Sequence, residues 1–529
     1  MYRDRDLELK DPVSTYAADQ IKDLGLQVLF EAMAGGDEFL LDVARKVILS
    51  DLTTPDEILY RQQVMVDCME NPDIVRELYG VVVDGILREK RIWGWMSEDY
   101  PMSTLTRAIE VLELFSGLLT KLRQIADQRS SLFHSEGFRR LFDVLVSELN
   151  DDYLQTIADH LHRLRFRGGV LMSAKLGQGN RGKALILRTP PLLRQRWIER
   201  FQDWFSQLGH KGEPSYFYEI ADRDEAGGNA LSELRNRGIA SVAAALAQST
   251  DHILSFFKMF RLELGFYLGC LNLHDRLTRK GEPVCIPVPL PADHPTFCGK
   301  ALYDPCLSLN MADRVVGNHV AAEEKTLVII TGANRGGKST LLRSMGLAQL
   351  MMQCGMFVAA ESFSAGVCKG IFTHFKREED TTMKSGKLDE ELSRMRAIVT
   401  AIVPHSLVLL NESFASTNER EGSEIARQIV RALLEMQIKV FYVTHMFDLA
   451  YSLHQTQMDS ALFLRAERLP DGQRTFRLTE GEPLPTSYGV DLYRRIFSTG
   501  QAAPEVSRTD GELVRPPNPR NNQSAQQIC

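Results

Sequence analysis

The 529-residue sequence lacks the features that mark a membrane or secreted protein. It has no run of about 18 or more apolar residues, the length that a helix needs to cross a bilayer, and its first residues, MYRDRDLELKD, lack the apolar core of a signal peptide. Its eight cysteines include no CxxC pair and no cysteine and histidine cluster with zinc-finger spacing. Scattered cysteines in a long chain fit a reducing compartment, so the sequence predicts a cytoplasmic protein without a membrane span.

An excess of positive charge is also missing. Lysine and arginine together number 62, against 69 aspartates and glutamates, which gives a net charge of −7. This balance excludes a protein that is basic over its whole surface, so any contact with nucleic acid must come from a local patch. The 25% of charged and 44% of hydrophobic residues exclude a wholly disordered or collagen-like chain. At about 100–200 residues per domain, the length predicts three or four domains.

The N-terminal half of the chain is dominated by helical patterns. Pro55 fits the first turn of a helix over 56–69, with Thr54 as its N-cap, and amphipathic runs over 105–122 and 141–164 predict further helices. A change follows near residue 168, where a glycine-rich loop separates two stretches that read as strands, at 170–175 and 184–188. A proline-free helical region over 230–277 is long enough to act as a lever, and a proline-rich linker or edge segment follows it.

From about residue 300 the pattern becomes α/β. Apolar runs at 327–330, 407–410 and 440–443 alternate with helical stretches and predict buried parallel strands. The predicted fold class is therefore a multidomain protein with a mainly α-helical N-terminal core and lever, a small β-containing insertion and a C-terminal α/β domain. The predicted boundaries are a helical core at 1–165, a clamp-like insertion at 166–229, a lever helix at 230–280, a linker at 281–299, an α/β domain at 300–500 and a disordered tail at 501–529.

A phosphate-binding motif lies at the start of the α/β part. The sequence Gly-Ala-Asn-Arg-Gly-Gly-Lys-Ser-Thr matches GxxxxGK[ST], with a strand pattern before it and a helical pattern after it. Glycines let backbone N–H groups turn toward phosphates, a lysine reaches the β- and γ-phosphates, and a hydroxyl ligates Mg²⁺. The predicted ATP-binding residues are Gly332, Ala333, Asn334, Arg335, Gly336, Gly337, Lys338, Ser339 and Thr340, with Ser339 also a metal ligand.

Two later strands end in polar side chains. The apolar run 407–410 leads into Asn411 and Glu412, and the run 440–443 leads into Thr444 and His445. Ligands of open α/β sheets bind at the carboxyl ends of strands, where a glutamate is able to polarise water and a histidine is able to hydrogen-bond a γ-phosphate. Glu412 and His445 are therefore the candidate catalytic residues.

These motifs together resemble the MutS family of DNA mismatch repair ATPases, a branch of the ABC-type P-loop ATPases. The resemblance rests on the segments 331–340, 355–361, 371–373, 407–412, 416–417, 444–445 and 487–489, and more weakly on 55–71. It implies ATP and Mg²⁺ as cofactors, a homodimer with composite ATP sites between two ATPase domains, and double-stranded DNA enclosed by the helical levers and clamp. It also implies that Asn411 joins Ser339 at the metal, and that Ser385, Ser416 and Thr417 contact the partner subunit near the nucleotide.

The sequence departs from the family at four places. The family usually has aspartate where this chain has Asn411, which predicts weaker metal affinity or slower hydrolysis but retained nucleotide binding. Ser385 stands without the Ser-Thr pair of the family's trans signature, and Val315 or Val316 replaces the usual aromatic residue beside adenine. The helical core pattern begins near the start of this sequence, so we expect a shortened family member that lacks the N-terminal mismatch-recognition domain with its Phe-x-Glu wedge. In such a member, DNA clamping does not imply mismatch specificity.

A basic stretch occupies the place where the family's clamp inserts. Arg163, Arg165 and Arg167 are followed by Lys183 in the predicted hairpin, and these are the candidate DNA contacts. The leading hypothesis is ATP-driven clamping on mismatched or otherwise irregular DNA. One alternative is a binder of branched or recombination DNA without mismatch specificity, and another is an ABC-type regulatory or ribosome-associated ATPase that does not bind DNA. DNA binding at low salt distinguishes the last of these.

Overall fold

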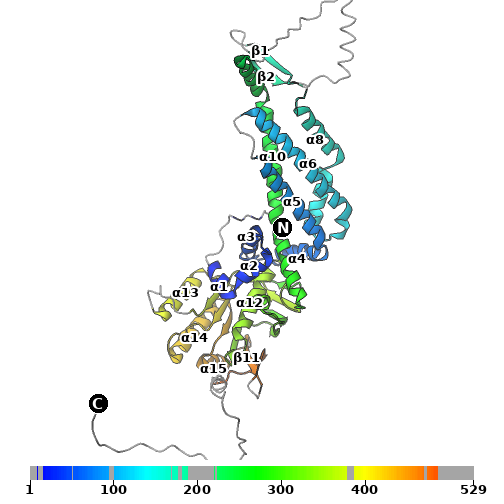
Figure 1. Cartoon of the computed structure of the whole chain (residues 1–529). Helices are drawn as coiled ribbons and strands as arrows, with labels where there is room; N and C mark the ends of the chain where they lie inside the picture. Colours follow the sequence, from blue (N-terminus) through cyan, green and yellow to red (C-terminus); the bar gives the residue numbers. More distant parts are fainter. Residues whose placement is uncertain are drawn as a thin grey trace, which may run out of the picture.

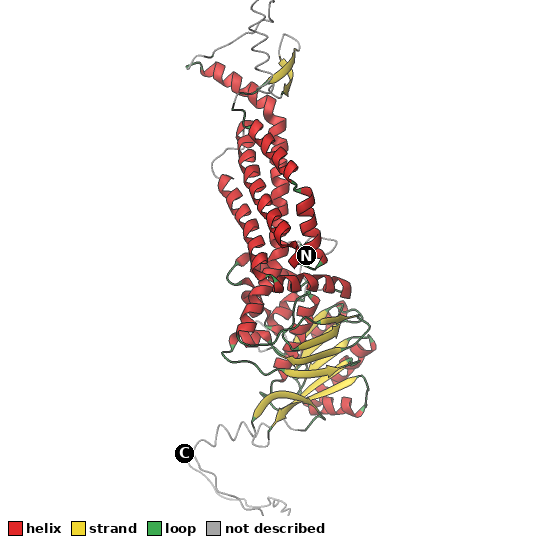
Figure 2. Ribbon diagram, turned by 90° about the vertical axis from the view of Figure 1, so that its right-hand side faces the viewer, coloured by secondary structure: helices red, strands yellow, loops and turns green. Residues whose placement is uncertain are grey.

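The structure is a computed structural model, and it describes part of the chain. The described residues are 7, 9, 16–50, 52–93, 100–167, 169–176, 182–188, 220, 223–377, 386–469 and 473–485. Three predictions therefore lie outside them, namely the role of Ser385, the motif at 487–489 and the tail at 501–529, and the side chain of Lys183 is likewise not described. Figures 1 and 2 show an α/β head at one end of a long helical shaft, with the hairpin β1–β2 at the other end of the shaft.

The head contains two sheets. In the six-stranded sheet the order is β12-β11-β6-β10-β9-β8, with β12 antiparallel to its neighbour and the other five strands parallel. The four-stranded sheet has the order β3-β7-β4-β5. The strands are β3 (Val288–Leu290), β4 (Phe297–Leu302), β5 (Asn318–Ala322), β6 (Leu327–Gly332), β7 (Ser362–Gly366), β8 (Ile371–Phe375), β9 (Leu407–Asn411), β10 (Lys439–Val443), β11 (Ala461–Arg468) and β12 (Arg474–Glu480). The three parallel strands predicted from the sequence, β6, β9 and β10, are confirmed.

The helices of the head cover and separate these sheets. They are α11 (Pro305–Asn310), α12 (Lys338–Gln353), α13 (Lys387–Ala401), α14 (Glu419–Glu435) and α15 (Phe447–Gln455). α12 follows the phosphate loop and contacts strands of both sheets, and nearly all of its side chains are buried. Such a helix carries no polar stripe because it has no solvent face, and it fixes the phosphate loop rigidly between two layers.

The shaft is built around α10 (Glu225–Arg279), a helix of 55 residues. It packs against α5 (Pro72–Trp93) and α6 (Pro101–Arg129), and Phe115 and Phe257 meet at the contact with α6 with ring centroids 5.0 Å apart. The other elements on this side are α4 (Pro55–Glu70), the short 3₁₀ helix η1 (Ser130–Leu132), α7 (Glu136–Glu148), α8 (Asp151–Leu164), β1 (Met172–Leu176) and β2 (Gly182–Leu187). The long helix predicted over 230–277 is thus present as α10, and the two strands predicted at 170–175 and 184–188 are present as β1 and β2 within a few residues. No helix among the described residues is long and apolar enough to span a bilayer.

The structure refines four local expectations. The helical run predicted over 141–164 is two helices, because Asn150 caps α8 by accepting a hydrogen bond from the Tyr153 N–H. α10 begins at Glu225, before the predicted start at residue 230, and the carboxylate of its N-cap residue Asp224 accepts the Gly227 N–H. Thr54 is the N-cap residue of α4, as predicted, but its hydroxyl donates to Glu57 Oε2 instead of accepting a backbone N–H. The predicted linker at 281–299 contributes β3, an edge strand paired with β7.

Three short helices connect the shaft to the head: α1 (Ala17–Leu24), α2 (Leu26–Ala34) and α3 (Glu38–Ile48). α1 packs against β8 and α12, and its Gln20 side chain donates to Ile371 O of β8 over 2.5 Å. The hydroxyl of Tyr16, the N-cap residue of α1, donates to Ala397 O of α13 over 2.9 Å. α2 and α3 pack against α10. Part of the segment predicted as a helical core domain therefore packs on the head, and one hydrophobic core continues from the head into the shaft.

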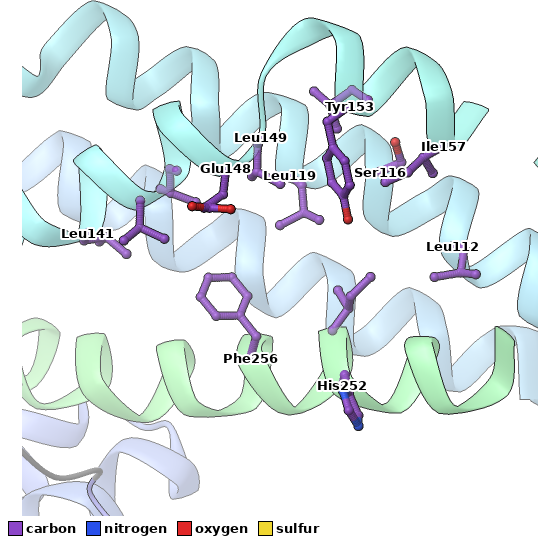
Figure 3. A pocket seen from close by; sticks show the side chains of 14 residues that line it. Leu112, Ser116, Leu119, Leu141, Glu148, Leu149, Tyr153, Ile157, His252 and Phe256 are labelled. Carbon is purple, nitrogen blue, oxygen red and sulfur yellow. The ribbon is translucent and has the colours of Figure 1, made fainter. Parts of the chain in front are cut away.

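The outer side of the shaft carries an apolar groove of about 320 Å³ between α6, α7, α8 and α10. Figure 3 shows Leu119, Tyr153 and Phe256 pointing into this space from three different helices. Glu148 lies at its edge, and His252 points away from it. The groove is remote from the phosphate loop in the fold, so it is not part of the site described next.

Candidate nucleotide-binding site

The predicted phosphate loop has the backbone that its sequence requires. It begins at Gly332, the last residue of β6, with φ 108°, and ends at Gly337, the N-cap of α12, with φ 91°. A Cβ at Gly332 would lie 2.8 Å from the Ala466 backbone nitrogen, so both the conformation and the space favour glycine there. The N-terminus of the 16-residue α12 points at the loop, and its unpaired N–H groups favour an anion.

Lys338 is the first residue of α12 and is buried. Its Nζ donates to the carbonyl oxygens of Gly332 and Ala333, at 3.0 and 3.2 Å, so the ammonium lies over the loop. Burial lowers the pKa of Lys338, nearby Glu412 opposes this, and Arg474 adds to the lowering. A bound polyphosphate would supply the negative charge that this buried cation lacks, and the loop carbonyls would release it.

The next residue, Ser339, connects the loop to a second strand. Its hydroxyl donates to Asn411 Oδ1 over 3.0 Å, across the sheet from α12 to the end of β9. The two oxygens are of the hard type that Mg²⁺ takes, and among the described residues no group of three or more His, Cys, Asp or Glu stands ready to hold a metal. Ser339 and Asn411 are therefore the residues that would hold the predicted Mg²⁺.

Glu412 and His445 lie side by side at this same sheet edge. Glu412 follows β9, His445 lies two residues after β10, and Glu412 Oε1 is 3.9 Å from His445 Nδ1. Nearby His445 is the main cause that lowers the pKa of Glu412, with further contributions from Lys338 and Lys376 that burial partly offsets. A lowered pKa favours the ionised carboxylate, the form that is able to accept a proton from water.

A pocket of about 350 Å³ adjoins the phosphate loop on the side of the second sheet. Gly337 and Thr340, next to Lys338 and Ser339, line this pocket. Val315 and Val316, the alternatives for the position that is usually aromatic in the family, line it as well. Phe476 from β12 also lines it, with a half-exposed ring. No sequence pattern indicates this aromatic residue, because β12 comes more than a hundred residues after the phosphate loop. The sheet order brings β12 close to the loop.

The wall of this base pocket is bonded to the head end of α10. Lys280 Nζ donates to the carbonyls of Ser308 and Met311, the latter over 2.8 Å. The buried carboxylate of Glu282 accepts from the Ser308 hydroxyl at 2.8 Å and from the Val315 N–H at 3.0 Å. Two residues just beyond α10 therefore hold the segment 308–315, which lines this pocket.

The other predicted residues are placed as follows. Asn334 and Arg335 are exposed at the top of the phosphate loop, and Arg335 also lines the base pocket. The Ser416 hydroxyl donates to Glu391 Oε1 and that of Thr417 donates to Glu421 Oε2, so both are bonded within this subunit. Gly336 is buried between Ala466 and the Ala333 carbonyl.

The candidate DNA contacts lie at the far end of the shaft. Arg163 and Arg167 are exposed on either side of the C-terminus of α8. Arg165 is exposed as well, but its guanidinium is paired with both carboxylate oxygens of Glu113 on α6, at 3.0 and 2.5 Å. Lys183 lies in β2 of the adjoining hairpin. The structure thus groups these residues at the hairpin end, where Arg163 and Arg167 are exposed and Arg165 is paired with Glu113.

Comparison with known protein families agrees with this architecture. Residues 53–280 match the model of the MutS2 N-terminal domain, and residues 328–500 match MutS domain V. The chain is 31% identical over 204 residues to Endonuclease MutS2 of Thermus thermophilus, which is 38% of this chain and 26% of that protein. It is 29% identical over 174 residues to DNA mismatch repair protein MutS of Petrotoga mobilis, covering 33% of this chain and 21% of the relative.

A further match extends over more of the chain. MutS protein homolog 4 of Homo sapiens is 27% identical over 332 residues, which is 56% of this chain and 34% of the human protein. The matched parts thus span about a fifth to a third of the lengths of these curated relatives.

Proposed function

The chain belongs to the MutS family, and from this premise we propose that it is an ATP-binding and ATP-hydrolysing protein that clamps double-stranded DNA. One observation carries the ATPase part of the proposal. Three parallel strands end at one edge of the sheet, and they bring together the phosphate loop after β6, Asn411 and Glu412 after β9, and His445 after β10. Phosphoryl transfer needs these parts, a phosphate cradle, a metal position and a group that orients water.

The proposed roles follow from the geometry. The backbone of 332–337, Asn334, Lys338 and Thr340 hold the phosphates, while Phe476 and Val315 enclose the base. Ser339 and Asn411 hold Mg²⁺, which would neutralise charge on the β- and γ-phosphates when bound. Glu412, whose pKa is lowered mainly by His445, accepts the proton of the attacking water, and His445 contacts the γ-phosphate.

We propose that hydrolysis is slow or that the site binds Mg²⁺ weakly. An amide at Asn411 keeps the oxygen ligand of a carboxylate but not its charge, and that charge favours the cation. Nucleotide binding should persist, because the loop backbone and Lys338 hold the phosphates, whereas Asn411 contacts the loop through the Ser339 hydroxyl.

The remaining parts of the proposal concern assembly. We propose a homodimer through the ATPase domains, with Ser385, Ser416 and Thr417 near the partner's nucleotide. We also propose the division predicted from the sequence, into a helical core, a clamp-like insertion, a lever and an ATPase head. Arg163, Arg165, Arg167 and Lys183 would contact DNA phosphates at the hairpin end of the shaft. The activity is placed in the cytoplasm, in keeping with the seven described cysteines, which are all free.

A binding panel tests the DNA part. The full chain is titrated with homoduplex, single-mismatch duplex and four-way junction, each with and without ATP and Mg²⁺, at low and moderate salt. Clamping on irregular DNA predicts tighter binding to the mismatch or the junction than to homoduplex, with ATP changing the affinity or lifetime. A preference for the junction alone favours the branched-DNA alternative, and no affinity for any DNA at low salt overturns the DNA part and favours the regulatory ATPase.

A further inference from the structure

The segment that carries Glu412 has an unusual backbone. Glu412 and Phe414 both adopt the left-handed conformation, with φ 52° and 63°, although neither is glycine. Side chains other than glycine rarely take this conformation, and it persists only where surrounding contacts hold it. The loop Glu412–Thr417, between β9 and α14, must therefore be held from outside.

One side of this loop is held by the sheet. The Glu412 N–H donates to Val443 O over 2.8 Å, continuing the pairing of β9 with β10. The Ser413 carbonyl accepts the Tyr442 hydroxyl at 2.6 Å, and the Ser413 hydroxyl donates to His374 O at 2.7 Å. The Phe414 ring is completely buried and stacks on the ring of His374.

The other side is held by a single carboxylate. Glu391, on α13, is 3% exposed, and its Oε2 accepts the Phe414 N–H over 2.7 Å. Its Oε1 accepts the Ser416 hydroxyl, also over 2.7 Å. Both oxygens of one buried side chain thus fix two points of the loop, and a charge-assisted hydrogen bond to a buried N–H is among the stronger polar contacts in proteins.

We propose that Glu391 is a positioning residue for hydrolysis, which acts by holding the loop so that Glu412 faces His445 and the phosphate loop; this rests on the proposed ATPase function. Glu412 lies between two anchors, Val443 O on one side and Glu391 on the other. Without Glu391, the Phe414 N–H loses its acceptor and the left-handed turn loses the contact that favours it. The Glu412 carboxylate then no longer stays 3.9 Å from His445. Small displacements of a catalytic group lower the rate steeply while leaving phosphate binding at a rigid loop intact.

Three variants of the full chain test this. Glu391→Ala removes both acceptors. Glu391→Gln preserves both contacts, because its amide oxygen accepts the Phe414 N–H and its amide N–H donates to the Ser416 oxygen. Glu390→Ala is the matched control, since Glu390 is the preceding residue on α13 and pairs with Arg394 and Arg377 instead of the loop.

Three readouts are taken for each variant: the ATPase rate, the dissociation constant of a fluorescent ATP analogue, and amide hydrogen exchange over 412–417 without nucleotide. Glu391→Ala should lower kcat by about 10- to 100-fold, leave the dissociation constant within about threefold, and speed exchange at Phe414. Glu391→Gln and Glu390→Ala should remain close to wild type in all three.

The outcomes separate the two proposals. A wild-type protein that neither binds nor hydrolyses ATP overturns the proposed function, and the inference with it. If the wild-type protein hydrolyses ATP and Glu391→Ala shows the same ATPase rate and the same hydrogen exchange, the inference alone is overturned. A loss of kcat and of nucleotide binding together in Glu391→Ala shows a role in general folding and also overturns it.

Discussion

The Ser339 hydroxyl donates a hydrogen bond to Asn411 Oδ1 over 3.0 Å, so the residue after the phosphate-loop lysine is bonded directly to the end of β9. The contact places the hydroxyl and the amide oxygen where they would share a metal ion. Because Asn411 carries a neutral amide, it would attract a metal ion less strongly than a carboxylate at the same position.

Replacing Asn411 by aspartate should strengthen the metal site. The carboxylate accepts the same Ser339 hydroxyl and adds one negative charge, so we expect half-maximal ATPase activity at a Mg²⁺ concentration about tenfold lower, or a kcat raised by a similar factor. Mg²⁺ titration of the ATPase rate measures both. Superimposable curves for Asn411→Asp and wild type would show that the amide does not limit the site.

Lys338→Met should separate nucleotide binding from stability. Burial lowers the pKa of Lys338, so an apolar side chain of similar length is expected to leave Tm unchanged or slightly higher. Loss of the phosphate contact should weaken ATP binding by about 100-fold or more. Thermal unfolding and calorimetric titration check the two effects, and a variant that unfolds well below wild type would contradict the stability half of the prediction.

The acid limb of the ATPase pH profile should depend on His445. The pKa of Glu412 is lowered in the folded protein, mainly by His445, so the carboxylate stays ionised as the pH falls toward the usual range of glutamate. Because the folded pKa lies below the unfolded one, this group contributes stability that is present above the unfolded pKa and is lost as the pH falls through the folded pKa. His445→Gln should move the acid limb of the rate to higher pH, whatever it does to the maximum rate. An acid limb at the wild-type pH in this variant would contradict the assignment.

Phe476→Ala should weaken the binding of ATP but not of its phosphate chain. Phe476 lines the pocket beside Gly337 and Thr340, and loss of stacking on a base costs about tenfold in affinity. Inorganic tripolyphosphate, which has no base, is the matched ligand, and competition assays with both ligands give the comparison. Equal weakening for ATP and tripolyphosphate would place the effect at the phosphate loop.

The salt dependence of DNA binding should distinguish the arginines at the hairpin end. Arg163 and Arg167 are exposed, whereas Arg165 is paired with Glu113. Arg163→Ala and Arg167→Ala should each reduce the slope of log affinity against log salt by about 1, and Arg165→Ala should reduce it less. Arg140→Ala is a suitable control, because Arg140 pairs with Glu136 on α7. Slopes that all equal that of wild type would exclude this end of the shaft as the DNA contact.

Much of this site was predictable because its residues lie in short, local patterns. An apolar run followed by polar residues marks each of its three segments, namely the phosphate loop, the strand before Asn411 and Glu412, and the strand before His445. The contributions of Phe476, Glu391 and Glu282 were not predictable in this way. Each lies on an element far from the loop in sequence, and each acts through a contact that only the sheet order or the packing of α13 creates.

The boundaries of helices show the same limit on a smaller scale. The pattern over 141–164 is continuous in hydrophobicity, so only the side chain of Asn150 and its bond to the Tyr153 N–H reveal the break. The proline-rich stretch after α10 was readable as a linker or an edge, and its pairing with β7 decides for the edge because prolines are tolerated where one side of a strand is unpaired.

The contacts of Lys280 and Glu282 attach one end of α10 to the head, while the other end of this helix lies far away at the hairpin. At 1.5 Å per residue, the 55 residues of α10 extend for about 80 Å beyond the base pocket, so a tilt of about one degree at the head moves the hairpin end by about 1.4 Å. Displacements too small to break a hydrogen bond at the Met311–Val315 wall are thus magnified at the other end. The stiffness of those few hydrogen bonds limits how finely the position of the distant end is controlled.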